Sequence, residues 1–186
     1  MSRIVPRKPE PFTYREYALL PEDGKRHELI EGEFYVTPSP NPRHQTVSRR
    51  LQQILMQQLE DTGIAQVFNA PMDVLLDDTT CVQPDLVVVR TARARMITER
   101  AIEGVPDLVV EILSPTHAGN DRFLKRQLYA RFGVHEYWIV DPAGWVTVLR
   151  SGMPERYDLE ARFDRASTLT SEEFPELAVP LDRVFR

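Results

Sequence analysis

Two acidic residues lie in runs of Leu, Val and Ile, and they constrain the fold more than any other feature of the chain. Asp85 opens the apolar run 85–89, and Glu111 interrupts the apolar run 108–113. Short runs of this kind predict buried central strands. A buried carboxylate is costly unless it is paired with a cation or binds a metal. We therefore expect neighbouring strands whose two carboxylates share a divalent-metal site.

The composition is typical of one ordinary globular domain. The chain has 186 residues, of which 42% are hydrophobic and 27% charged, and we expect one domain over 1–186 with a loose, Pro-rich arm at 1–11. No apolar stretch approaches the roughly 20 residues that span a bilayer, and the N-terminus has no signal-peptide core. Cys81 is the single cysteine, which excludes an intramolecular disulfide and a cysteine zinc cluster. We expect a cytoplasmic protein without a membrane segment.

The net charge of −5 provides no general attraction to nucleic acid. A metal-dependent nuclease can still be acidic, because the bound cation offsets the carboxylates of its site locally. Basic residues do gather after each of the two apolar runs, although solvated helix faces are the favoured explanation of such clusters. These residues are Arg90, Arg93, Arg95 and Arg100 after the first run, and Arg122, Lys125, Arg126 and Arg131 after the second.

The order of predicted elements indicates the α/β class, with a mixed β-sheet flanked by helices. The run 107–113, the helix 121–132 and the strand 136–140 form a βαβ unit, whose crossover is long enough for parallel pairing. The other predicted elements are a helix opened by a capping box at 13–16, a hairpin at 26–36, a helix at 43–61, and strands at 64–68, 72–76, 84–90 and 145–149.

Carboxylates on adjacent strands are hard oxygen ligands, which suit Mg²⁺ or Mn²⁺. Asp85 and Glu111 are therefore the candidate metal ligands. Such a cation activates water and stabilises the charge on a phosphate undergoing hydrolysis. Lys125 is the candidate positive group, because it lies near the start of the helix that follows the Glu111 strand. An ordinary i,i+4 ion pair with Asp121 would also explain Lys125.

Two further candidates are Glu28 and His44. His44 begins the long helix after a proline-rich loop, where it could line the site as a base or phosphate contact, or simply lie on the surface. Glu28 alternates with the apolar Leu29, so a solvated strand residue is the competing interpretation. Ser114 and His117 suggest hydrolase parts, but the chain has no Gly-x-Ser-x-Gly motif, and we discount a serine hydrolase.

Several segments in the span of about residues 12–150 together form a specific pattern. They are 27–33 (His-Glu-Leu-Ile-Glu-Gly-Glu), 43–45 (Arg-His-Gln), 83–87 (Gln-Pro-Asp-Leu-Val), 110–115 (Val-Glu-Ile-Leu-Ser-Pro), Asp121 with Lys125 and Tyr129, and 133–141 (Gly-Val-His-Glu-Tyr-Trp-Ile-Val-Asp). On these segments the chain resembles the Uma-two family of restriction-endonuclease-like proteins, within the PD-(D/E)xK nuclease superfamily.

The resemblance implies a restriction-endonuclease-like core in which Asp85 and Glu111 are the two acids of the nuclease motif. Leu113 stands where the superfamily pattern expects a lysine, two residues after the second acid. The family pattern suggests that Lys125 on the next helix serves instead. Glu28 and His44 also match positions that line the site in this family.

Three functional hypotheses follow. The first is a Mg²⁺- or Mn²⁺-dependent endonuclease that hydrolyses nucleic-acid phosphodiester bonds, with DNA as the expected substrate. The second is a catalytically inactive nucleic-acid-binding or interaction module on the same fold, which Leu113 and the acidic net charge favour. The third is a metal hydrolase that acts on a different phosphoester.

A homodimer is also predicted. An exposed strand at Tyr137-Trp138 and an apolar hairpin strand at 145–149 would provide a self-association edge. The alternative is that both segments pack in the core.

Overall fold

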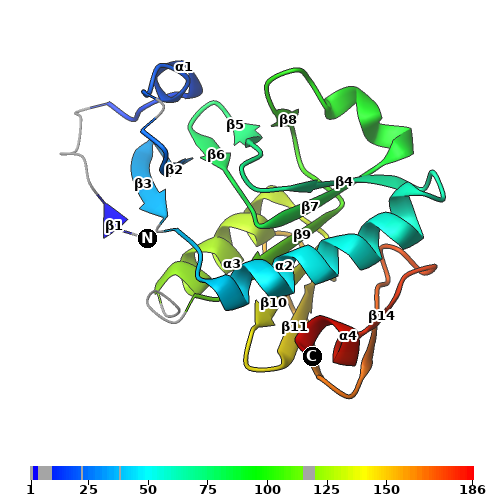
Figure 1. The fold of residues 1–186 in the computed structure, drawn as a ribbon. Helices are drawn as coiled ribbons and strands as arrows, with labels where there is room; N and C mark the ends of the chain where they lie inside the picture. The colour runs from blue at the N-terminus through cyan, green and yellow to red at the C-terminus, as the bar shows by residue number, and fades with distance from the viewer. Residues whose placement is uncertain (1, 4–9, 22, 38, 115–119) are drawn as a thin grey trace.

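The computed structural model describes residues 2–3, 10–21, 23–37, 39–114 and 120–186. For residues 120–122 it describes the backbone alone. In the described residues two six-stranded sheets and one two-stranded sheet pack with helices (Figure 1). We call the two large sheets the central sheet and the N-terminal sheet. The helices are α1 (Tyr14–Tyr17), α2 (Pro42–Leu55), the π-helix η1 (Met56–Glu60), the 3₁₀-helix η2 (Thr91–Met96), α3 (Asn120–Phe132) and α4 (Leu181–Phe185).

The central sheet is mixed, as predicted. Strand β9 pairs with β10 in parallel across the α3 crossover, and its other neighbour, β7, is antiparallel. The remaining pairs of this sheet are antiparallel. In spatial order its strands are β12 (Leu159–Asp164), β11 (Trp145–Arg150), β10 (Glu136–Asp141), β9 (Leu108–Ile112), β7 (Leu86–Arg90) and β4 (Ala65–Asn69).

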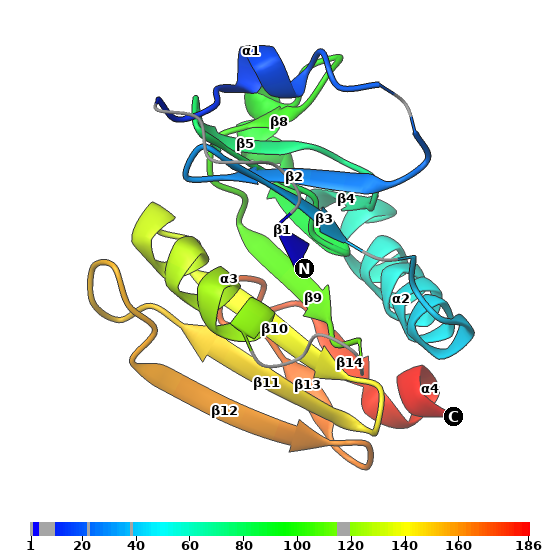
Figure 2. The ribbon, with the colours of Figure 1, turned by 90° about the vertical axis from the view of Figure 1, so that its left-hand side faces the viewer.

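The N-terminal sheet lies across the end of the central sheet that carries β4 and β7 (Figure 2). In spatial order its strands are β1 (Ser2–Arg3), β3 (Glu33–Thr37), β2 (Arg26–Ile30), β6 (Thr80–Val82), β5 (Val74–Asp77) and β8 (Ile102–Glu103). The two-stranded sheet contains β13 (Thr168–Thr170) and β14 (Ala178–Pro180).

Helices α2 and α3 cover opposite faces of the central sheet, which alternation of side chains along each strand makes possible (Figure 2). Asn41 caps α2 by accepting a hydrogen bond from the His44 backbone at 2.9 Å, and Pro42 occupies the first helical position. The α2 side of the sheet buries Leu86, Val88, Val110, Ile112, Trp138 and Val140. The α3 side buries Val87, Val89, Val109, Tyr137 and Ile139.

A loose N-terminal arm was predicted for 1–11, and part of this segment is ordered against the N-terminal sheet. Residues 2–3 pair with β3, while 4–9 lie outside the described residues. Pro11 packs on the β2–β3 turn, where Gly32 has a φ of 73°. A Cβ at Gly32 would lie 2.3 Å from Pro11 Cβ, so this turn needs glycine for space as well as for conformation.

The strand at Tyr137-Trp138 is not an exposed edge. Tyr137 and Trp138 are 1% and 0% exposed, because β10 is an interior strand with a helix-covered core on each face. Strand β11 likewise pairs with β12 on its outer side. The premise of the homodimer prediction is therefore wrong for this surface, and the oligomeric state stays a prediction. No helix in the described part of the chain is long and apolar enough to cross a membrane.

Candidate active site

Asp85 and Glu111 lie side by side on neighbouring strands. The pairing of Leu86 with Val110 across β7 and β9 brings Asp85, just before β7, next to Glu111. The backbone N–H of Ile112 donates to Asp85 Oδ2 at 2.8 Å, which ties the first acid to the second acid's strand. The prediction that two acid-bearing strands are neighbours is therefore confirmed.

Lys125 reaches the acid pair from α3. Its Nζ lies 2.7 Å from Glu111 Oε1 and 2.6 Å from Glu28 Oε1, and the residue is only 5% exposed. Tyr129, one helical turn further along α3, donates its hydroxyl to Glu111 Oε1 at 2.8 Å. Lys125, on the helix that follows the Glu111 strand, therefore contacts the second acid directly. The alternative partner, Asp121, has a side chain outside the described residues.

Glu28 is not a solvated strand residue, since it is 0% exposed. Strand β2 buries both of its faces: Leu29 packs against Tyr17 beneath α1, whereas Ile30, on the same side as Glu28, joins the core under α3. Alternation with an apolar neighbour therefore failed to predict exposure here. Besides Lys125, the backbone N–H of Gln83 donates to Glu28 Oε1 at 2.8 Å, so the buried charge is compensated.

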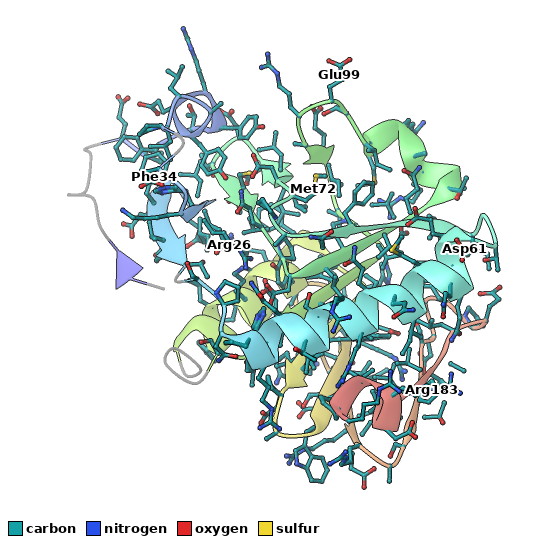
Figure 3. The ribbon with its side chains drawn as sticks, viewed as in Figure 1. Arg26, Phe34, Asp61, Met72, Glu99 and Arg183 are labelled. Carbon is teal, nitrogen blue, oxygen red and sulfur yellow. The ribbon has the colours of Figure 1, made fainter. Side chains whose placement is uncertain are left out.

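Two basic side chains hold Asp85. His44 Nε2 lies 3.0 Å from Asp85 Oδ2, and Arg26 Nη1 lies 2.9 Å from Asp85 Oδ1. Because a carboxylate accepts hydrogen bonds, Nε2 of a neutral His44 carries the proton, and Nδ1 is a buried acceptor without a partner among the described residues. Arg26, whose side chain is labelled in Figure 3, also donates from Nη2 to the Gln83 carbonyl.

Sequence reasoning identified five of the residues that meet here, but it missed Arg26. A signal for it existed, because Arg26 precedes Glu28 by two residues and a strand places such residues on one side. Leu113, at the position of the expected lysine, packs in the core under α3. His117 lies outside the described residues, so its hydrolase interpretation is untested by the structure.

The two acids differ in their pKa. Burial alone would raise the pKa of Asp85, but the His44 hydrogen bond and the Arg26 charge lower it below the ordinary 3.8. Burial raises the pKa of Glu111 to about 7; Lys125 opposes this effect, while the charges of Asp85 and Glu28 add to it. Neighbouring carboxylates with pKa values pushed apart are typical of catalytic sites.

The donor set fits a hard divalent cation. The site combines three carboxylates, Glu28, Asp85 and Glu111, with two permanent cations, Arg26 and Lys125, which leaves a negative excess. In the described part of the chain no group of three or more His, Cys, Asp or Glu side chains is arranged to hold a metal ion by itself. Mg²⁺ does not require one, because it is commonly held by one or two carboxylates, waters and substrate phosphate.

A cavity of about 650 Å³ opens beside Asp85. Arg26, His44 and Asp85 line one end of it, which we call the Asp85 end, and the first turns of α2 form one wall. The segment 69–71, which follows β4, also lines it. Asp85 therefore borders a space that a small ligand can enter.

A mixed sheet flanked by two helices, with paired acids and a lysine at one end, is the architecture of restriction-endonuclease-like proteins. Residues 14–182 match the Uma2 family, whose description is "Putative restriction endonuclease", and the chain belongs to this family.

Two comparisons agree with this membership. The chain is 32% identical over 130 residues to an uncharacterized protein of Synechocystis sp., with 67% of this chain and 66% of that protein covered. The crystal structure of "a putative nuclease belonging to DUF820" from Anabaena variabilis superposes with a TM-score of 0.76 and 24% identity, covering 94% of this chain and 98% of that one. At this identity the superposition shows the shared fold.

Proposed function

We propose that this protein is a metal-dependent endonuclease that hydrolyses phosphodiester bonds of nucleic acid, with DNA as the expected substrate. The observation that carries the proposal is the position of Lys125, which contacts Glu111 and Glu28 beside Asp85 although it comes from a helix. It supplies a cation next to the second acid, where Leu113 cannot. Family membership and the shared fold support the same class.

Asp85 and Glu111 would hold Mg²⁺ or Mn²⁺. Such a cation, when bound, lowers the pKa of water and stabilises charge on the phosphate. Both carboxylates keep lone pairs for this purpose: each carboxylate has about four acceptor sites, and the protein contacts use only some of them.

The chain's own residues prepare the site in two ways. Arg26 and His44 hold Asp85 ionised and fixed in direction, which is the state that a metal ligand needs. Glu28 accepts a hydrogen bond from the ammonium of Lys125, and Tyr129 donates a hydrogen bond to Glu111, the other partner of Lys125. Lys125 is then a preorganised positive charge, which stabilises the negative charge that develops on a phosphate during hydrolysis.

The test is cleavage of supercoiled plasmid and of single- and double-stranded oligonucleotides with Mg²⁺, with Mn²⁺ and with EDTA. Asp85→Asn keeps the shape of the side chain and removes its charge, so cleavage is expected to fall by at least about 100-fold. Asp182→Asn, at an exposed position on α4, is the matched control. Unchanged cleavage by folded Asp85→Asn protein would contradict the assignment.

A second candidate function is a non-catalytic nucleic-acid-binding or interaction module. It is favoured by the contacts that engage both oxygens of Asp85. Calorimetry with Mn²⁺ separates the two candidates. Binding that disappears in Glu111→Gln supports the nuclease, whereas oligonucleotide binding without any Mn²⁺ binding supports the module.

We further propose a cytoplasmic location, on the argument that the single cysteine, Cys81, is a buried free thiol. A homodimer remains a prediction as well. It now lacks the exposed strand edge on which it was based.

A further inference from the structure

The cavity next to Asp85 has a polar wall that the acid pair does not use. This wall is distinct from the Asp85 end formed by Arg26, His44 and Asp85. Helix α2 turns its apolar side chains toward the central sheet and leaves its polar side chains facing the cavity. The polar side chains that carry the argument are Gln45, Arg49 and Gln52 on α2, and Asn69 at the end of β4.

The spacing of the α2 residues places them on one side of the helix. Gln45, Arg49 and Gln52 are separated by four and three residues, so they lie in a row along the helix axis. The row begins next to His44, which contacts Asp85. Gln52 Nε2 donates to Asn69 Oδ1 at 2.9 Å, and this bond closes the far end of the cavity.

Arg49 is an exposed cation whose side chain forms no ion pair or hydrogen bond with any described residue. Two nearby arginines differ from it: Arg26, which also lines the cavity, is held by Asp85, and Arg50, the next residue of α2, donates to the carbonyl of Val184. In a chain of net charge −5, an exposed cation without an ion-pair partner among the described residues is suited to an anionic ligand.

The side chains of the wall have the chemical groups needed to bind the phosphate and the base of one nucleotide. A guanidinium binds a phosphate through two parallel hydrogen bonds. Carboxamides of Gln and Asn bind the donor and acceptor edges of bases. A volume of about 650 Å³ falls within the range of small-ligand sites, which is roughly 300–1,000 Å³. The buried Nδ1 of His44, without a partner in the described structure, adds an unused acceptor at the Asp85 end.

We propose that this cavity binds a nucleotide of the nucleic-acid strand immediately next to the phosphate that the acid pair attacks. Arg49 binds the neighbouring phosphate, and the Gln52–Asn69 pair contacts the base edge. The inference rests on the proposed nuclease function, and it adds the residues that position the strand and read one of its bases.

The test measures binding, so it does not depend on catalysis. Glu111→Gln protein is titrated with a fluorescent single-stranded oligonucleotide and with the matching duplex at several NaCl concentrations, and fluorescence anisotropy is recorded. Adding Arg49→Ala is expected to weaken binding about five- to tenfold and to reduce the slope of log K against log salt by roughly 0.7 for the single strand. The matched control is Arg95→Ala, which removes an equally exposed arginine from η2.

A second variant separates base contact from phosphate contact. Gln52→Leu is expected to leave the salt slope unchanged and to reduce the difference in affinity between oligonucleotides of different base composition. Equal effects of Arg49→Ala and Arg95→Ala would overturn the inference, as would the absence of any oligonucleotide binding. Loss of cleavage in Asp85→Asn without an Arg49 effect would leave the nuclease standing and remove only this cavity's role.

Discussion

At the scale of single residues, the site depends on a buried lysine between a buried acid, Glu28, and a partly buried acid, Glu111. Lys125 is 5% exposed and Glu28 is 0% exposed, so neither charge is stabilised by bulk water. Removal of one partner from a buried ion pair leaves an uncompensated charge, which costs more than the pair itself contributes. The arrangement that we propose for catalysis therefore also contributes to stability.

Lys125→Met is expected to lower the free energy of unfolding by about 3–5 kcal/mol at pH 8 in EDTA, because Glu28 and Glu111 lose their shared cation. Urea denaturation followed by circular dichroism measures this. Lys25→Met, at a 61% exposed side chain, is the control and should change little. The double variant with Glu28→Gln should recover part of the loss, and no recovery would argue against the pairing.

At the scale of elements, α2 connects the core, the acid pair and the cavity. Val47, Leu51 and Leu55 anchor it in the core, while His44 in its first turn contacts Asp85. The predicted helix at 43–61 is present, but its regular α-helical part ends at Leu55 and η1 continues it. The start of the helix is set by Asn41, whose side chain fixes the backbone of the same His44.

Asn41→Ala is expected to cost about 1 kcal/mol of stability, because the His44 N–H loses its cap. Asn41→Asp, which keeps a capping oxygen, is the control. Thermal and urea unfolding of the three proteins tests the expectation. If alanine and aspartate behave alike, the cap does not contribute.

At the scale of the whole molecule, the N-terminal sheet supplies two of the side chains that surround the acid pair. The N-terminal sheet lies over one end of the central sheet (Figure 2). It brings Arg26 into contact with Asp85, and Glu28 into contact with Lys125. The result is a cluster in which Lys125, Tyr129, Asp85 and Glu28 all act on Glu111. The titration of Glu111 therefore contributes to the free energy of unfolding of the whole domain.

The pKa of Glu111 is about 7 in the folded protein and has the ordinary value of 4.5 when unfolded. Between these values the folded state binds more protons, so the free energy of unfolding should fall by roughly 1–3 kcal/mol as pH rises from about 4.5 to 7. Asp85 acts in a different window: its pKa lies below 3.8, so its contribution is lost only as pH falls further.

The measurement is urea denaturation at pH 5 and pH 7.5 in EDTA, with Glu111→Gln as the comparison. The variant should lose this part of the pH dependence. Identical pH dependence in both proteins would show that Glu111 titrates normally.

The sequence by itself determined the strands, their acids and the parallel βαβ unit. Alternation and apolar runs are local properties, so 84–90, 107–113 and 136–140 could be recognised as strands without knowledge of their partners. The resemblance gave further support to Lys125, Glu28 and His44 as candidates, and the structure brings all three to the acid pair.

Only the tertiary structure decided how those residues are surrounded. Glu28 and Lys125 are 97 positions apart in sequence, and Arg26 and Asp85 are 59 apart, so no local pattern reports their contacts. Whether a strand's second face is covered depends on what packs over it. For this reason Glu28 is buried where alternation predicted solvent, and Tyr137 and Trp138 lie in the core where an exposed edge was predicted.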